Sequence, residues 1–390
     1  MYTHHQTIFN QLLDFLPFRT FDSLVGQHKL DRYKKNFSAK NLLYILMYSQ
    51  IAGKDSLRDI ETSLGVLENN HYHRWMKSIK RSTIAYNNNL YNPQIFEELF
   101  YSLVRDIQQF YPHQTFKYYS LDSTTITLSL KLFSWAKYST TKWAVKMHML
   151  LDNQNLIPSV VNITTGKVAD ITEAKKMEIE EKIGKWDFLV YDKGYVDYEW
   201  YQKLNTQWIF FVTRPKKNMD YLVIESKNIG INWVLKDETI EIFNPHCKKT
   251  YKWNLRLIYY ISPDDGKEYQ FLTNNFEVDA EVIALLYKKR WQIETFFKFI
   301  KQTLKIKSFL WTSENAVKNQ LRVAMIYYLI LCYIKFKTKI KQWLLELSRI
   351  FSAGILLRRK LIDLLGLTPQ NLEKILPYIR WWPIIQLSLF

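Results

Sequence analysis

The order of strand-like and helix-like segments between residues 115 and 213 limits the fold more than any other feature of the sequence. Three segments rich in Tyr, Phe, Thr, Val and Ile predict an antiparallel meander, and they are Thr115–Leu130, Trp143–Leu151 and Leu156–Ile163. The next segments predict helix, strand, helix and strand in turn, over Asp170–Ile183, Trp186–Tyr191, Tyr198–Leu204 and Trp208–Thr213. The two short apolar runs are typical of buried parallel strands.

This order is the one expected of a ribonuclease-H-like α/β core. The chain before it predicts helices, among them Ala39–Ile51 with Ser38 as its N-cap, and a later helix opening on Lys80–Thr83 would present donors to a DNA groove. We therefore predict five segments: a helical DNA-binding region (1–110), the first part of the core (111–215), a β-rich insertion (216–271), the second part of the core (272–312) and a helical basic C-terminal region (313–390).

The chain carries an excess of basic residues, with a net charge of +17 and a pI near 9.4. The positive electrostatic field of such a chain attracts phosphate, which favours a polyanionic partner. Between Glu281 and Trp343, thirteen Lys and Arg residues stand against three acidic ones, and aromatic residues alternate with them. Phosphates and exposed bases are bound by surfaces of this kind. A basic protein of a membrane surface is the weaker alternative, since no lipid-anchor motif appears.

No segment of the sequence predicts a membrane span or a secretory signal. The longest apolar run, Val323–Ile334, is too short to cross a bilayer, so we predict a buried helix there. Cys247 and Cys332 are too few for a disulfide framework or a cysteine-type zinc site. The N-terminus lacks a basic region followed by an apolar signal core. We therefore expect a cytoplasmic protein with no membrane partner.

The segment Leu285–Lys301 contains no Gly or Pro and predicts a helix. Along that helix, one stripe roughly 60° wide at about 100° per residue would carry Tyr287, Arg290, Glu294 and Lys301. One acid held among three hydroxyl or cationic donors is unusual on an exposed face, where charges normally scatter. The alternative is an ordinary solvated stripe in which Glu294 pairs with its basic neighbours.

Two further acids stand at the predicted core strands. Asp122 lies within the first strand and Asp192 directly follows the fourth. Adjacent parallel strands would bring these carboxylates close together, and Glu294 would complete the set from a helix packed on the sheet. Converging carboxylates repel one another unless a cation lies between them, which indicates a divalent metal such as Mg²⁺. Two such ions about 3.5–4 Å apart would activate a nucleophile and stabilise the leaving oxygen in phosphodiester displacement.

Each acid also has a purely structural alternative. Asp122 could bond to its hydroxyl neighbours at the end of a strand, and Asp192 could cap the turn at Gly194. His148, on a predicted strand, is better explained as a packed histidine than as a metal ligand. Turn or cap roles explain the remaining aspartates of this region: Asp152, Asp170, Asp187 and Asp197.

The sequence resembles the DDE transposases of the insertion-sequence-4 group. The group's signature of Tyr, two residues, Arg, three residues, Glu, six residues and Lys is matched at Tyr287, Arg290, Glu294 and Lys301. The context LDST at Asp122 and the context DKGY at Asp192, followed by FFVTR, are similar to the group's strand motifs. The similarity extends from Phe18 to Lys307 and includes RSTIA at Arg81–Ala85.

This resemblance implies a ribonuclease-H-like fold, Mg²⁺ as the cofactor with Mn²⁺ as a substitute, and action on double-stranded DNA, both transposon ends and target. It implies two sets of site residues: Asp122, Asp192 and Glu294 as the metal-binding catalytic triad, and Tyr287, Arg290 and Lys301 as contacts to DNA phosphates. The β-rich insertion would help to shape the cut end. The implied location is the bacterial cytoplasm or nucleoid.

The implied mechanism is hydrolysis followed by strand transfer. Water nicks the end of the element and frees a 3′-hydroxyl, which in this group typically forms a hairpin that is reopened before attack on target DNA. Pairing of two ends implies a homodimer in the DNA complex. Two alternatives remain: a ribonuclease-H-like nuclease or resolvase, and a catalytically silent DNA-binding protein derived from a transposase. Incubation with end-bearing DNA and Mg²⁺ distinguishes the three by joined products, cut products only, or bound but uncut DNA.

Overall fold

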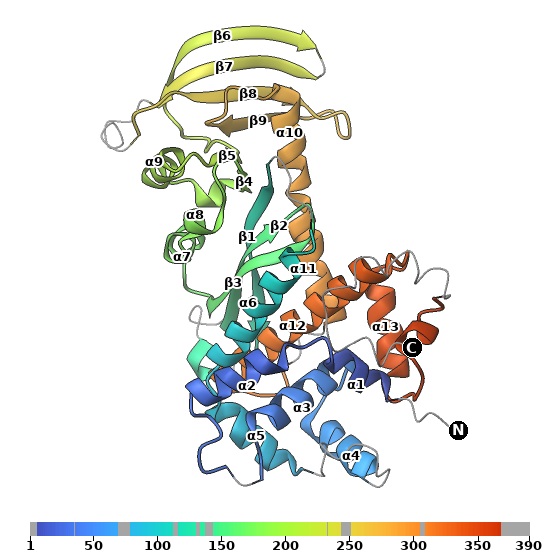
Figure 1. Cartoon of the computed structure of the whole chain (residues 1–390). Coiled ribbons are helices and arrows are strands. Elements are labelled where there is room, and N and C mark those ends of the chain that lie inside the picture. The colour runs from blue at the N-terminus through green and yellow to red at the C-terminus, as the bar shows by residue number, and fades with distance from the viewer. Residues whose placement is uncertain are drawn as a thin grey trace. The chain divides into compact units, whose positions relative to one another are not determined.

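The computed structural model of the chain describes residues 6–34, 36–68, 79–111, 116–129, 133–136, 143–231, 233–242, 251–304 and 309–367. The chain divides into two compact units (Figure 1). The sheet unit comprises residues 112–128 and 136–298, and the helical unit comprises residues 1–111, 129–135 and 299–390. Several predictions fall partly outside the described residues: the ends of the strand Thr115–Leu130, the part of the β-rich insertion at 243–250 that contains Cys247, the part of the N-terminal region at 69–78, and the C-terminal region from residue 368.

The first five strands of the sheet unit follow the predicted order. They are β1 (Tyr118–Leu128), β2 (Trp143–Asp152), β3 (Ile157–Thr165), β4 (Phe188–Tyr191) and β5 (Phe210–Thr213). β1 pairs antiparallel with β2, and β2 with β3, so the predicted meander is confirmed. β4 lies parallel to β1, and β5 parallel to β4. The fold is therefore mixed α/β, with a large sheet and helices.

Helices connect the third, fourth and fifth strands. They are α7 (Asp170–Lys176), α8 (Ile179–Lys182) and α9 (Tyr198–Thr206). The prediction of one helix over Asp170–Ile183 is wrong, because Glu178 adopts a left-handed conformation with φ of 48° between α7 and α8. Left-handed backbone ends a right-handed helix, and a glutamate gives no local sign that it will adopt it.

Side chains of the strands alternate between two faces of the sheet, and both faces are buried. One face packs against α7, α8 and α9 and includes Tyr119, Leu121, Leu189, Tyr191 and Leu257. The other face packs against α10 (Ala280–Lys289) and includes Tyr118, Phe188, Val190, Val212 and Ile258. Two buried faces explain the continuous apolar runs in the sequence of the central strands.

Four more strands extend the same sheet. They are β6 (Tyr221–Ile231), β7 (Val234–Ile242), β8 (Leu255–Ile261) and β9 (Glu268–Thr273), and β9 pairs antiparallel with β5. The nine strands lie in the order β3-β2-β1-β4-β5-β9-β8-β7-β6, with β6 at one edge (Figure 1). The segment is β-rich as expected, but its strands continue the core sheet instead of forming a separate one. Lys227-Asn228, predicted as a turn, lies inside β6. The boundaries of the five predicted segments stay a prediction.

The segment Leu285–Lys301, predicted as one helix, contains a break at Arg290. α10 ends at Lys289, and α11 spans Trp291–Thr303. The N–H of Arg290 donates to the carbonyl of Tyr287, and the carbonyl of Arg290 accepts from the N–H of Ile293, both at 3.0 Å. These three-residue spacings tighten the turn. Arg290 keeps right-handed helical dihedral angles, so the chain continues in a helical path through the break.

The helical unit is built around one long helix. α12 (Glu314–Thr338) packs against α3 (Ala39–Ile51), α5 (Arg81–Leu90), α6 (Gln94–Gln108) and α13 (Leu344–Gly354). The remaining helices of this unit are α1 (Ile8–Leu13), α2 (Phe18–Gln27), α4 (Leu57–Glu68) and α14 (Leu361–Leu364). The predicted cap of α3 is confirmed, since Ser38 and Asn41 form a capping box. The run Val323–Ile334 lies within α12 and is buried except for the partly exposed Tyr333, as predicted.

Asn87–Asn89, predicted as a turn, lies inside α5. Asparagine is a poor helix former, but here tertiary contacts compensate. Asn87 accepts from the ammonium of Lys34 at 2.8 Å, and Asn88 accepts from the amide of Asn319 at 2.9 Å. Cys332 is a free, buried cysteine of α12, and burial raises the pKa of its thiol to about 12. Among the described helices, none is both long enough and apolar enough to span a bilayer.

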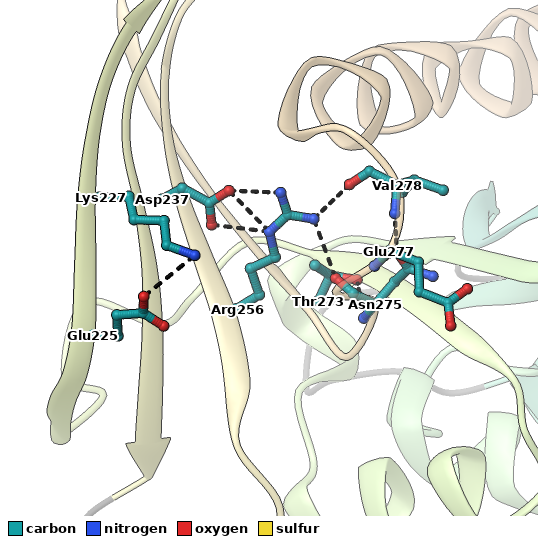
Figure 2. Close-up of polar contacts among 8 residues, drawn as sticks. All are labelled: Glu225, Lys227, Asp237, Arg256, Thr273, Asn275, Glu277 and Val278. Carbon is teal, nitrogen blue, oxygen red and sulfur yellow. Dashed lines mark hydrogen bonds and ion pairs between the residues drawn. The ribbon is translucent and has the colours of Figure 1, made fainter.

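A buried guanidinium ties the added strands to the start of α10. Arg256 of β8 donates from Nη2 to Oδ2 of Asp237 at 2.6 Å and from Nε to both oxygens of that carboxylate. Its Nη1 donates to the carbonyl of Val278 at 2.6 Å and to that of Asn275 at 3.4 Å (Figure 2). The loop that receives these bonds leads directly into α10. Arg256 therefore fixes the point from which α10 leaves the sheet.

We expect Arg256→Ala to destabilise the sheet unit by about 3–5 kcal/mol, because it leaves the carboxylate of Asp237 buried without its counter-charge. The side chains of Arg256 and Asp237 are 10% and 14% exposed. Urea denaturation followed by circular dichroism measures the change. Lys227→Ala is the matched control, since its ion pair with Glu225 is 68% and 59% exposed and should contribute at most about 1 kcal/mol. Equal losses in the two variants would contradict the assigned role of Arg256.

Candidate active site

Two aspartates stand where neighbouring parallel strands stop pairing. The last paired residues of β1 and β4 are Leu121 and Tyr191, so Asp122 and Asp192 are the next residue on each strand. Because side chains alternate, Asp122 shares the sheet face of Tyr118, and Asp192 continues the face of Val190. That is the face against which α10 packs. The predicted approach of the two carboxylates on adjacent parallel strands follows from this register.

Each aspartate also makes the local hydrogen bond that its structural alternative predicted. Oδ1 of Asp122 accepts from the N–H of Ser123 at 2.8 Å, and Oδ1 of Asp192 accepts from the N–H of Gly194 at 2.7 Å. A Cβ at Gly194 would lie 2.8 Å from Oδ1 of Asp192, so only glycine fits this turn without a shift. These bonds fix the orientation of both carboxylates, and they do not exclude a further role.

Arg290 links Asp122 to Glu294. Its Nη1 lies 3.3 Å from Oδ2 of Asp122, and its Nη2 lies 2.6 Å from Oε1 of Glu294. The guanidinium is 10% exposed, and its Nε has no hydrogen-bond partner among the described residues. The helical break at Arg290 and the ion pair to β1 occur at the same residue. The structure thus brings Asp122, Arg290 and Glu294 together. The sequence predicted that Arg290 and Glu294 share a helix stripe and that Glu294 approaches Asp122, but it did not predict the ion pair between Arg290 and Asp122.

Burial is the main influence on the charge of Asp122. It raises the pKa of this carboxyl to about 6, and the negative charges of Asp192 and Glu294 act in the same direction to a smaller extent. The N–H of Ser123 and the cation of Arg290 act in the opposite direction. One guanidinium therefore offsets only part of the cost of burying the charged form of Asp122.

Tyr287 and Lys301 occupy different places along the two helices. Tyr287 is partly buried on α10, where its ring lies 5.0 Å from that of Phe271, and the guanidinium of Arg290 lies 5.6 Å from its ring centroid. Burial raises the pKa of its hydroxyl. Lys301 lies two turns beyond Glu294 on α11, within the helical unit.

Comparison with known proteins assigns the chain to a family. The family model described as "Transposase DDE domain" matches residues 117–330, which is more than half of the chain and contains all six predicted site residues. The chain belongs to the DDE transposase family. A second model, described as "Domain of unknown function (DUF4372)", matches residues 4–77.

Curated relatives of this DDE transposase-family chain carry transposase names. A protein of Sinorhizobium fredii, named as transposase y4zB, is 37% identical over 216 residues, covering 54% of this chain and 59% of that protein. A protein of Geobacillus stearothermophilus, named as a transposase of insertion sequence element IS5377, is 30% identical, and the match covers 58% of this chain and 59% of that protein. A protein of Synechocystis sp., named as a transposase of insertion sequence element IS4SA, is 26% identical, and the match covers 61% of this chain and 66% of that protein. The chain thus spans about three fifths to two thirds of the length of these relatives. The resemblance to insertion-sequence transposases is confirmed.

A second polar cluster lies behind Asp122 in this transposase-family chain, and the sequence did not reveal it. Ser123 points to the opposite face from Asp122 and donates from Oγ to Oδ1 of Asp170 at 2.6 Å. The ammonium of Lys146 lies 3.2 Å from the same oxygen. Asp170, predicted as a turn or cap residue, is instead the first residue inside α7, because the N-cap is Ala169, and it holds the residue next to Asp122. The alternation of side chains along β1 is the only sequence signal for this contact.

His148 is a packed histidine, as predicted. It is 1% exposed and its Nε2 lies 2.9 Å from Oγ1 of Thr164. Burial lowers the pKa of its imidazole to about 4, so the ring is neutral at pH 7. Its Nδ1 lies 3.6 Å from Oδ1 of Asp170, but a neutral ring forms no ion pair with that carboxylate.

The site residues fit a hard divalent cation by donor type. Asp122, Asp192 and Glu294 offer carboxylate oxygens, the ligands that Mg²⁺ prefers. Burial is the main cause of the raised pKa of Asp122, and a cation beside this carboxylate would favour its charged form. Within the described ranges, no three His, Cys, Asp or Glu side chains are spaced to hold one ion, and Arg290 lies between two of the candidates.

Replacement of Asp122 by Asn should stabilise the metal-free protein at neutral pH. An acid whose pKa is raised on folding binds its proton more tightly in the folded state, so stability falls as the pH rises from about 4 to about 6. The Asn amide keeps the acceptor for Ser123 without the charge. We expect Asp122→Asn to exceed the wild type by about 2 kcal/mol at pH 7, with no difference near pH 4.

Chemical denaturation in EDTA across this pH range measures the effect. Glu199→Gln is the control, because its side chain is 77% exposed and the substitution should leave stability unchanged at every pH. A wild type as stable as Asp122→Asn at pH 7 would mean that burial does not disfavour the charged form.

Proposed function

We propose that the chain is a DNA transposase that cuts transposon ends and joins them to target DNA. One observation carries this proposal. Asp122 and Asp192 end the pairing of two adjacent parallel strands, on the face of the sheet where α10 and α11 bring Arg290 and Glu294. Family membership supports the same activity, and the order β3-β2-β1-β4-β5 supports a ribonuclease-H-like core.

We infer that Asp122, Asp192 and Glu294 would hold Mg²⁺, or Mn²⁺ in its place. A divalent ion held by these carboxylates would lower the pKa of a water or 3′-hydroxyl and stabilise the leaving oxygen in phosphodiester displacement. The carboxylates would then no longer depend on Arg290 as their counter-charge. Its guanidinium, which forms bidentate contacts with phosphate readily, would become available to DNA.

The chain's own residues would act through position and charge. The N–H groups of Ser123 and Gly194 hold the two aspartates in fixed orientations, so little reorganisation is needed on binding DNA. Tyr287, Arg290 and Lys301 would bind the phosphates of the strand being cut. Water attack at the transposon end releases a 3′-hydroxyl, and attack by that hydroxyl on target DNA exchanges one phosphodiester for another. The exchange needs no external energy source.

The proposed partners are double-stranded DNA and a second copy of the chain. The net charge of +17 supports binding to a polyanion. Two transposon ends must be cut and joined together, which favours a homodimer in the DNA complex.

Asp122→Ala, Asp192→Ala and Glu294→Ala should each abolish cleavage and leave binding of end DNA nearly intact, because these side chains act on the metal. Gel analysis of labelled end DNA with Mg²⁺ follows nicking and joining, and filter binding follows affinity. Glu199→Ala, at an exposed acid of α9, is the control and should cut normally. Near-normal nicking by one of the three variants would remove that residue from the site. Cut products without joined products from the wild type would favour a nuclease.

Arg290→Ala and Lys301→Ala should each weaken binding of end DNA and reduce the log–log salt slope by about one unit, because each removes one phosphate contact. Lys298→Ala is the matched control, since this exposed lysine lies on the same helix outside the stripe. Titrations at several salt concentrations give the slopes. An unchanged slope in either variant would place that residue away from the DNA backbone.

A further inference from the structure

A cluster of aromatic side chains lies in the sheet unit where three neighbouring parallel strands begin. Its members precede or open β1, β4 and β5, and they are Phe116, Trp186, Phe188, Trp208 and Phe210. The candidate active site lies at the other ends of these strands, since Asp122 and Asp192 follow the last paired residues of β1 and β4. Trp186 and Asp192 are six residues apart, which is about 20 Å in extended chain. The cluster is therefore separate from the carboxylates.

The rings of this aromatic cluster form one continuous series. The ring centroids are 5.7 Å apart for Phe116 and Phe188, and 5.2 Å apart for Phe188 and Phe210. Trp186 continues the series, at 5.7 Å from Phe210 and 5.0 Å from Trp208. Phe188 is buried beneath the cluster, whereas Phe116, Trp186 and Trp208 are 39%, 47% and 55% exposed. Large apolar side chains that are exposed together mark a binding surface.

Hydrogen bonds between the loops hold the aromatic cluster in place. The N–H of Trp186 donates to the carbonyl of Trp208 at 2.7 Å. The carboxylate of Asp187 accepts from the N–H of Lys117 at 2.7 Å and from that of Gly184 at 3.1 Å. The chain segments that begin the three strands are thereby tied to one another. A ligand of this surface meets rings that are already arranged, which lowers the entropy cost of binding.

The exposed charge around the aromatic cluster is positive. In the segments 116–117, 181–188 and 205–210, three lysines stand against two acids, Glu181 and Asp187. Asp187 is buried, and the two backbone N–H groups described above occupy its carboxylate. The surface therefore combines exposed rings with an excess of cations.

This combination favours a single-stranded nucleic acid over a protein partner. The cores of protein–protein interfaces are depleted in lysine. Single strands, in contrast, stack their bases on aromatic side chains and place their phosphates beside basic ones. In a duplex the faces of the bases are covered by neighbouring base pairs, so only unpaired bases can stack on these rings.

We propose that the aromatic cluster binds unpaired bases of single-stranded DNA, with Trp186 and Trp208 as the stacking residues. The choice of DNA over RNA rests on the proposed function, in which the chain acts on DNA. The binding itself needs neither metal nor cleavage. Failure of this inference and failure of the proposed function are therefore distinguishable.

Fluorescence anisotropy in EDTA tests the proposal with labelled oligothymidylate of about ten nucleotides, a typical length for one such site. An abasic strand of the same length carries the same phosphates without bases. The wild type should bind oligothymidylate about tenfold more tightly than the abasic strand. Trp208→Ala should remove most of this preference and leave affinity for the abasic strand unchanged. Trp208→Phe keeps an aromatic ring and should retain the preference.

Trp233→Ala is the matched control. Trp233 is 56% exposed with φ of 67°, close to the 55% and 61° of Trp208, but it lies in the turn between β6 and β7. This variant and Asp122→Ala should both bind the two strands as the wild type does. Circular dichroism checks that every variant keeps the fold.

Four results would each overturn the proposal. They are equal affinity of the wild type for the two strands, an unchanged preference in Trp208→Ala, an equal loss in Trp233→Ala, and loss of the preference in Asp122→Ala, which would place the bases at the carboxylates. Tighter binding of oligouridylate than of oligothymidylate would overturn the choice of DNA.

Discussion

The contact of Arg290 with Asp122 and Glu294 is the interaction on which the candidate site depends. One buried guanidinium connects the central strand β1 to the junction of α10 and α11, 168 residues later in the chain. Without that cation, the two carboxylates would face each other and Asp192 across a partly buried space. The ion pair therefore connects two distant parts of the sequence and offsets part of the repulsion between their carboxylates. It also explains why the helical path tightens at Arg290 although the local sequence contains no helix breaker.

The helix α10, which leads to this contact, is held at its start and along one side. At the start of the helix, Arg256 bonds to the preceding loop and to Asp237, so the added strands fix where α10 leaves the sheet. Along its length, α10 buries Ile283, Ala284 and Leu286 against the same sheet face that carries the two aspartates. A helix held at its start and packed along one side has little freedom to rotate. The added strands thus contribute to the position of Glu294 without contacting it.

Local sequence predicted much of this fold because the relevant signals act over short distances. The cap of α3 depends on Ser38 and Asn41, which lie three residues apart, and the buried strands show as continuous apolar runs. The signals failed where a distant residue decides the outcome. Asn87 and Asn88 remain helical because Lys34 and Asn319 bond to them, and Asp170 bonds to Ser123 across the sheet. Strand and helix positions in the sequence selected Asp122, Asp192 and Glu294 as candidates, and the family motifs supported them, whereas the position of Arg290 between two of them needed the structure.

The electrostatics of the site connect the fold to the proposed chemistry. The N–H groups of Ser123 and Gly194 hold the aspartates, and Arg290 holds Glu294 at the junction of α10 and α11. Burial, with the charges of Asp192 and Glu294 acting in the same direction, raises the pKa of Asp122. A group of carboxylates that is fixed in place and short of positive charge has a higher affinity for a cation than flexible carboxylates would have. Arg290 supplies one positive charge and a divalent ion would supply two, so under the proposed function the ion would take the place of the guanidinium, which would then be available to a DNA phosphate.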